Sequence, residues 1–137
     1  MKTILFACVH NAGRSQMAAA WFNQLADPAK VRGVSAGTQP GPHVHPEVAL
    51  AMKEVGIDLS NQQPRLLSDE LARSTFLLIT MGCGEACPHV PGVERDDWPL
   101  EDPKGKSIAG VRKIRDAIRD RVRDLLDARG WRRPPGR

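Results

Sequence analysis

Cys8, Arg14 and Ser15 form a short segment whose residue types and spacing suit chemistry on an oxyanion. In the stretch CVHNAGRS, five residues separate the cysteine from the arginine, and the serine follows directly. An arginine guanidinium offers a planar fork to two oxygens of a tetrahedral anion, and a serine hydroxyl can donate a hydrogen bond to sulfur. The segment predicts either a cysteine nucleophile beside a bound oxyanion or a buried structural cysteine in an incidental turn.

The backbone between these side chains suits an anion-binding loop. Asn11 and Gly13 are residue types that tolerate unusual backbone angles. A loop that leads into a helix aims successive N–H groups inward, and the helix dipole adds positive potential that also favours a cysteine thiolate. The candidate oxyanion-binding residues are Val9, His10, Asn11, Ala12, Gly13 and Arg14, with Cys8 as the candidate nucleophile.

Such a loop needs a strand before it and a helix after it, and the sequence predicts both. TILFACV (3–9) is nearly all apolar and too short for a helix, whereas RSQMAAAWFNQLA (14–26) carries apolar residues four apart. Further strands are predicted at 30–37, 75–81 and 93–98, and further helices at 46–55, 67–74 and 107–129.

Apolar strands that alternate with helices predict one α/β domain, a four-stranded parallel sheet with helices on both faces, over residues 1–129. Residues 130–137 are expected to form a loose basic tail. Ligands of parallel sheets bind outside the carboxyl ends of the strands. Because Cys8 follows the first strand and Cys83 follows the third, we expect both loops at the same edge.

Composition narrows the function classes. The 137 residues suit one domain, and the longest apolar run is far shorter than a membrane span. Three cysteines without an export signal argue against a secreted disulfide framework, so we expect a cytoplasmic monomer without a membrane partner. The net charge of +4 is concentrated in residues 104–137, where acids alternate with arginines as on a solvated helix face. No aromatic stacking pattern accompanies them, so we expect no nucleic-acid partner.

The segment CVHNAGRSQMA (8–18) resembles the signature of the low-molecular-weight tyrosine phosphatase superfamily, and more closely that of its arsenate reductase branch. The similarity extends to SAG (35–37), AMKEVGIDLSNQ (51–62), TMGCGEACP (80–88) and DWPLEDP (97–103). The phosphatases carry a tyrosine-bearing acid loop, and this chain has no tyrosine. The resemblance implies a flavodoxin-like topology and an oxidoreductase that detoxifies arsenic, with phosphate or sulfate as mimics of arsenate and a phosphatase as the rival enzyme.

The resemblance also implies the family's general acid at Asp102, in the segment LEDP, with Glu101 as a substitute. Proton donation is needed because displacement of an arsenate oxygen must release water. An aspartate before a proline is also a common turn former, so a structural role stays open.

Cys83 and Cys87 are four residues apart, and one helical turn would bring their Cα atoms within about 6 Å, which is disulfide range. The resemblance to thioredoxin-coupled reductases implies a relay in which Cys83 attacks the Cys8 thio-arsenate and Cys87 then attacks Cys83. Relatives that use mycothiol with mycoredoxin would instead rely mainly on Cys8. Both routes need an external thiol donor but no bound cofactor and no metal.

Two further interpretations of these cysteines stay open. They are inert packing residues, or Cys83, Cys87 and His89 bind zinc with His43 or His45 in a zinc- or anion-binding regulatory module. The spacing differs from that of paired Cys-x2-Cys zinc sites.

Some relatives bind potassium near the anion loop, and the resemblance matches their pattern only in part. Asn11 and Ser35 agree with it. At positions 19 and 65, where those relatives carry acidic ligands, this chain has alanine and arginine.

Overall fold

The computed structural model describes residues 1–82 and 90–135. Four strands form one sheet: β1 (Lys2–Cys8), β2 (Val31–Gly37), β3 (Leu77–Thr80) and β4 (Glu94–Asp97). The helices are α1 (Arg14–Leu25), α2 (Pro46–Glu54), α3 (Asp69–Arg73) and α4 (Ile108–Arg129). Every strand and helix predicted from the sequence is present, with ends that shift by only one or two residues.

All strand pairs in this sheet are parallel, in the order β2-β1-β3-β4. Ala7 of β1 is paired with Ala36 on one side and Thr80 on the other, so the carboxyl ends of the three strands meet at one edge. The outermost strand, β4, is exposed at all four residues and carries only charged side chains, which disfavour pairing with another chain.

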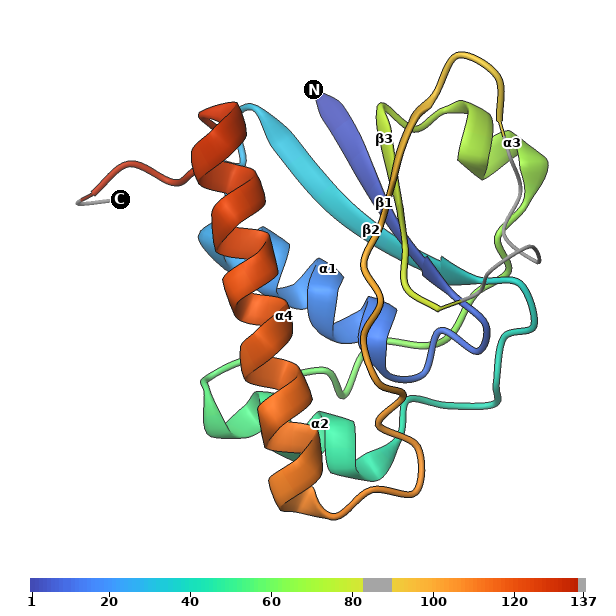
Figure 1. Ribbon diagram of the computed structural model, residues 1–137, viewed down its shortest axis with the longest axis vertical. Helices are drawn as coiled ribbons and strands as arrows, with labels where there is room; N and C mark the ends of the chain where they lie inside the picture. The colour runs from blue at the N-terminus through green and yellow to red at the C-terminus, as the bar shows by residue number, and fades with distance from the viewer. Residues whose placement is uncertain (83–89, 136–137) are drawn as a thin grey trace.

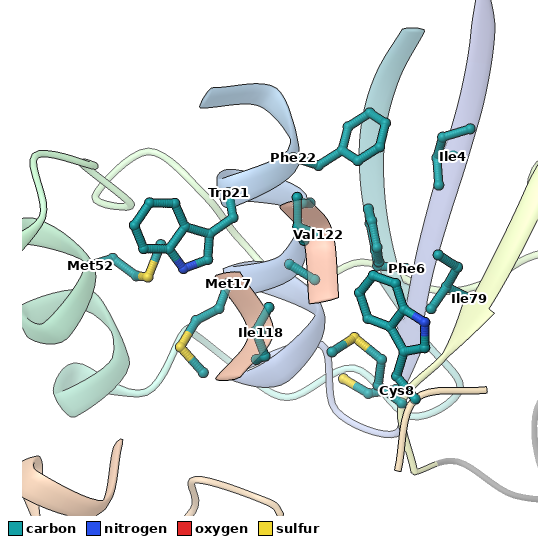
Figure 2. Close-up of a cluster of buried hydrophobic side chains, with 14 of the residues drawn as sticks. Ile4, Phe6, Cys8, Met17, Trp21, Phe22, Met52, Ile79, Ile118 and Val122 are labelled. Carbon is teal, nitrogen blue, oxygen red and sulfur yellow. The ribbon is translucent and has the colours of Figure 1, made fainter. Parts of the chain in front are cut away.

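Alternation along β1 divides the core between the two faces of the sheet. Ile4, Phe6 and Cys8 join the large cluster of buried side chains with α1, α2 and α4 (Figures 1 and 2). Leu5 and Ala7 join a smaller cluster that includes residues of α3. The described elements therefore confirm a parallel sheet with helices on both faces, and β1 directs the Cys8 side chain towards α1.

The long helix α4 carries the alternating charges that the sequence predicts on a solvated face. Arg115 is an exception, because it is only 9% exposed. Its guanidinium Nη1 donates to the Ala51 carbonyl at 2.9 Å and to Glu54 Oε1 at 3.0 Å, so this arginine ties α4 to α2. No helix within the described residues is long and apolar enough to cross a bilayer.

The segment after α4 differs from the expected loose tail. Trp131 is 7% exposed, and its carbonyl accepts a hydrogen bond from the Asp27 N–H at 2.8 Å. The Arg133 N–H donates to the Leu25 carbonyl at 2.8 Å, and the Trp131 ring meets Phe76 edge-on. The prediction was wrong for these residues because burial of an indole outweighs the entropy of a few ordered residues.

Candidate active site

Cys8 is the last residue of β1 and lies at the end of the core cluster, 4% exposed (Figure 2). Its Sγ is 2.9 Å from Ser15 Oγ in the first turn of α1. The Asn11 amide donates to Ser15 Oγ at 2.7 Å. A thiolate only accepts hydrogen bonds, so when Cys8 is ionised the Ser15 hydroxyl donates to it and stabilises the negative charge on sulfur.

The backbone carbonyls of the loop after Cys8 point towards residues 38–45. N–H groups of residues 38–45 donate to four of them: Thr38 to Cys8 at 3.2 Å, Gln39 to Val9 at 2.8 Å, Gly41 to His10 at 2.9 Å and His45 to Ala12 at 3.0 Å. A trans peptide points its N–H opposite to its C=O. The N–H groups of Val9, His10, Asn11 and Gly13 therefore face away from residues 38–45, and we call this arrangement of donors the cradle.

Asn11 fixes the middle of this cradle. It is fully buried and is the one non-glycine residue within the described ranges with a positive φ, 51°. Its Oδ1 accepts hydrogen bonds from the Arg65 N–H at 3.0 Å and from Gln16 Nε2 at 3.2 Å. Asparagine tolerates the left-handed region better than other side chains, which explains its place in the loop.

Two glycines let other segments approach the cradle. A Cβ on Gly37, at the end of β2, would lie 2.5 Å from the Val9 carbonyl oxygen. A Cβ on Gly13 would lie 2.6 Å from Pro103 Cγ. The end of β2 and the segment around Pro103 thus contact the loop closely, and a larger residue at position 37 or 13 would push the contacting segments apart.

Arg14 and Asp102 meet at the start of α1. The Arg14 side chain is 10% exposed, and Nη1 donates to the Leu100 carbonyl at 2.9 Å, while Nη2 lies 3.7 Å from Asp102 Oδ2. Asp102 also accepts a hydrogen bond from the Lys104 N–H at 3.0 Å. The same aspartate thus forms a turn and faces the guanidinium beside the cradle. Its carboxyl is 49% exposed, which gives it access to solvent protons.

Glu101, the alternative acid, points to a different partner. Its carboxylate pairs with Lys106 Nζ at 2.9 Å and is 74% exposed. The hydrogen bond from Lys106 lowers the pKa of Glu101, so this group is ionised at neutral pH and is poorly suited to donate a proton.

His45, which the sequence suggested only as a zinc ligand, lies beside the start of α1. A Cβ on Gly13 would be 3.5 Å from His45 Cδ2, so the ring lies over the start of α1. Burial lowers the pKa of His45, opposed by the nearby carboxylates of Asp102 and Glu47. Within residues 1–82 and 90–135, no group of three His, Cys, Asp or Glu side chains could hold a metal ion.

The other thiols of the predicted relay, Cys83 and Cys87, and the candidate zinc ligand His89 lie outside the described residues. Gly82, directly before Cys83 in the chain, is described. Its φ is +87°, and a Cβ there would collide with the Arg14 guanidinium, so the chain passes beside Arg14 one residue before Cys83.

Sequence reasoning missed three residues that support the cradle. Gln16 is 4% exposed and donates from Nε2 to the Asn11 carbonyl at 3.1 Å. Arg65 holds Asn11 through its backbone N–H, and Leu100 holds Arg14 through its carbonyl. In the sequence, a glutamine in the first turn of the expected helix was the available signal. Backbone donors and acceptors leave no signal in the sequence.

The fold places a thiol beside a loop of backbone N–H groups at the carboxyl edge of a parallel α/β sheet. Residues 3–130 match the family model described as low molecular weight phosphotyrosine protein phosphatase. The chain belongs to this family, as the segment from Cys8 to Ala18 predicts.

Within the family, the chain is similar to arsenate reductases. It is 40% identical over 123 residues to the arsenate reductase of Staphylococcus aureus, which covers 86% of this chain and 91% of that protein. A structure of an arsenate reductase in the phosphate binding state has 32% identity and a TM-score of 0.78, and covers 93% and 98% of the two chains.

A third similarity is to the thioredoxin-dependent arsenate reductase of Corynebacterium glutamicum. The identity is 38% and the TM-score is 0.81, with 93% of this chain covered. The chain spans only 61% of that longer neighbour.

Proposed function

We propose that this protein is an arsenate reductase in which Cys8 is the nucleophile. The observation that carries the proposal is the placement of two pairs at the start of α1: the Cys8 thiol with the Ser15 hydroxyl, and the Arg14 guanidinium with the Asp102 carboxyl. The similarity to named arsenate reductases supports arsenate as the anion. Phosphate has nearly the same shape and charge, so the cradle suits it as a competing ligand.

In the first step, the Cys8 thiolate attacks arsenic and an arsenic–oxygen bond breaks. Asp102 gives its proton to the departing hydroxyl, which leaves as water, and a covalent Cys8 thio-arsenate remains. The cradle N–H groups and Arg14 stabilise the charge on the other arsenate oxygens. Ser15 stabilises the thiolate before attack through the bond of 2.9 Å.

In the second step, the Cys83 thiolate attacks Cys8 Sγ and forms a disulfide. The electron pair of the sulfur–arsenic bond goes to arsenic, which is reduced from As(V) to As(III) and leaves as arsenite. Cys87 then attacks Cys83, which frees the Cys8 thiolate and leaves a Cys83–Cys87 disulfide. This order is supported by the parallel register of β1 with β3, and by the approach of Gly82 to Arg14 directly before Cys83.

The final reductant is a dithiol protein of the thioredoxin type, which attacks the Cys83–Cys87 disulfide and is itself oxidised. The similarity to a thioredoxin-dependent neighbour supports this choice. A low-molecular-weight thiol such as mycothiol would instead act on the arsenate held by Cys8 and would leave Cys87 without a role.

Turnover with defined reductants tests this proposal. The protein is assayed with arsenate plus a thioredoxin system or plus mycothiol and mycoredoxin, and separately with an aryl phosphate. We expect arsenite formation with thioredoxin, loss of that turnover in Cys87→Ser, and a Cys83–Cys87 disulfide by mass spectrometry. Turnover with mycothiol alone would overturn the relay. Rapid phosphate release from the aryl phosphate without arsenate reduction would overturn the reductase assignment.

A further inference from the structure

The potassium ligands of some relatives raise the question of whether this chain can hold a cation beside Asn11. Asn11 Oδ1 already accepts two hydrogen bonds, from the Arg65 N–H at 3.0 Å and from Gln16 Nε2 at 3.2 Å. The Ser35 carbonyl accepts from Arg65 Nε at 3.0 Å. Ala19 has no oxygen in its side chain. These residues do not fit a potassium ion, because their oxygens face donors.

We propose that Arg65 replaces the cation and is the positioning residue that makes the cradle independent of potassium. Its guanidinium carries a permanent positive charge and donates to the Ser35 carbonyl at the end region of β2. Its backbone N–H donates to Asn11, and its carbonyl accepts from the Gly37 N–H at 2.8 Å. One residue thus connects β2 with the anion-binding loop through both its side chain and its backbone.

A continuous set of hydrogen bonds leads from Arg65 to the reactive sulfur. The Arg65 backbone N–H donates to Asn11 Oδ1, Asn11 Nδ2 donates to Ser15 Oγ at 2.7 Å, and Ser15 Oγ lies 2.9 Å from Cys8 Sγ. Asn11 and Ser15 are fully buried, so neither has water as an alternative partner. Loss of the guanidinium bond to Ser35 frees the backbone at residue 65, whose N–H holds Asn11, and so loosens the orientation of Ser15.

The space around Arg65 is open enough to hold a guanidinium in place of a cation. A cavity of about 520 Å³ is lined by Ala19, Ser35 and Arg65, among others. Arg65 is exposed there, so solvent screens its charge, and its effect on Cys8 comes from the fixed hydrogen bonds rather than from a long-range field. The open cavity also keeps the guanidinium hydrated, which avoids the cost of burying a charge.

The test compares Arg65→Met with Arg32→Met. Methionine keeps an unbranched side chain but removes the donor at position 65. Arg32 is a matched control, because it is an exposed arginine on β2 with one side-chain bond, from Nε to Thr3 Oγ1 at 3.1 Å, far from the cradle. For each protein, the rate of Cys8 alkylation by iodoacetamide is followed in the Cys8 peptide by mass spectrometry, and the thermal midpoint is measured in KCl and in NaCl of equal ionic strength.

Both readouts work without arsenate, so their outcome is separate from that of the proposed function. We expect the wild-type protein to give the same midpoint and the same alkylation rate in KCl and NaCl. Arg65→Met loses the side-chain bond to Ser35 that fixes the backbone N–H on Asn11, so it should alkylate about three- to tenfold more slowly, and Arg32→Met should match the wild type. A wild-type midpoint or rate that rises in KCl but not in NaCl would overturn the proposal. An Arg65→Met rate equal to that of the wild type would overturn it as well, and the salt comparison stands even if that variant fails to fold.

Discussion

Ser15 is the residue on which we expect the reactivity of Cys8 to depend. Its oxygen accepts from Asn11 and lies 2.9 Å from the sulfur, to which its hydroxyl can donate when Cys8 is a thiolate. A hydroxyl is required here because a thiolate accepts hydrogen bonds, and an apolar residue would leave a buried anion with one donor fewer.

Ser15→Ala should therefore slow the reaction of Cys8 while the fold remains. Loss of a hydrogen bond to a charged group predicts a decrease of about tenfold or more in both alkylation rate and kcat. Ser74→Ala is the control, since Ser74 donates to the Leu71 carbonyl on the exposed side of α3. An unchanged Cys8 reactivity in Ser15→Ala would show that the hydroxyl does not stabilise the thiolate.

His45 makes stability depend on pH in the mildly acidic range. Burial lowers the folded-state pKa of His45 from the ordinary 6.5, against the opposing effect of Asp102 and Glu47 and with a smaller contribution from Lys104 and His10. The unfolded chain therefore binds a proton more readily than the folded one. The contribution of His45 to stability is complete above pH 6.5 and is lost as the pH falls through the lower, folded value.

His45→Gln should accordingly flatten the pH dependence. Thermal midpoints of the wild type and the variant are measured from neutral pH into the acid range. We expect the wild-type midpoint to fall more steeply than that of the variant below pH 6.5, and the two curves to run parallel above it. Parallel curves throughout would contradict the role assigned to burial of the ring.

Among single residues, the candidate site residues could be proposed from the sequence, but the residues that hold them in place by hydrogen bonds could not. Cys8, Arg14, Ser15 and Asp102 follow from residue type, spacing and family resemblance. Arg65 contributes through a backbone N–H and a bond across 30 residues to Ser35, so only the folded chain reveals its place.

At the scale of elements, the site depends on how closely β2 approaches the loop after β1. Gly37 is paired with Cys8, and a Cβ on it would lie 2.5 Å from the Val9 carbonyl oxygen and 2.9 Å from the Asn11 nitrogen. Both atoms belong to the backbone, which cannot move aside without deforming the cradle.

Gly37→Ala should thus lower the free energy of unfolding by about 1–3 kcal/mol through overpacking, and should lower Cys8 reactivity as well. Gly110→Ala in α4 is the control. Its nearest new neighbour would be Lys106 Cβ at 3.4 Å, so the helix should be unchanged or gain about 0.5 kcal/mol. Urea titration checks both variants, and a Gly37→Ala protein as stable and reactive as the wild type would refute the close approach.

The elements themselves were predictable because the two central strands are mostly apolar and two helices begin at a serine cap. Ser68 and Ser107 accept from the N–H groups of Leu71 and Gly110, as expected at helix N-termini. The register between strands was not predictable, since continuous apolar strands carry no alternation that would distinguish one alignment from the next.

In the whole molecule, the segment after α4 packs against the rest of the domain and does not extend away from it. Trp131 bonds to Asp27 near the end of α1, and its ring contacts Phe76 directly before β3 and the Arg129 guanidinium. The sequence GWRRPPGR suggests a tail by composition, and one buried indole reverses that expectation.

Trp131→Ala should lower the free energy of unfolding by about 3 kcal/mol, as large-to-small substitutions of buried aromatic residues do. Pro134→Ala, at an exposed position three residues on, should leave it unchanged. Chemical denaturation measures both, and equal stabilities of the two variants would support the loose tail that the sequence suggests.

A single-turnover experiment tests directly whether Cys8 in its cradle delivers electrons to arsenate. Fully reduced protein is mixed with arsenate without any external reductant, and arsenite is quantified together with the disulfides formed. We expect one burst of arsenite stoichiometric with protein in the wild type, a disulfide between two of the three cysteines, and no arsenite from Cys8→Ser. Arsenite released by Cys8→Ser, or a wild-type protein that forms none, would contradict this expectation.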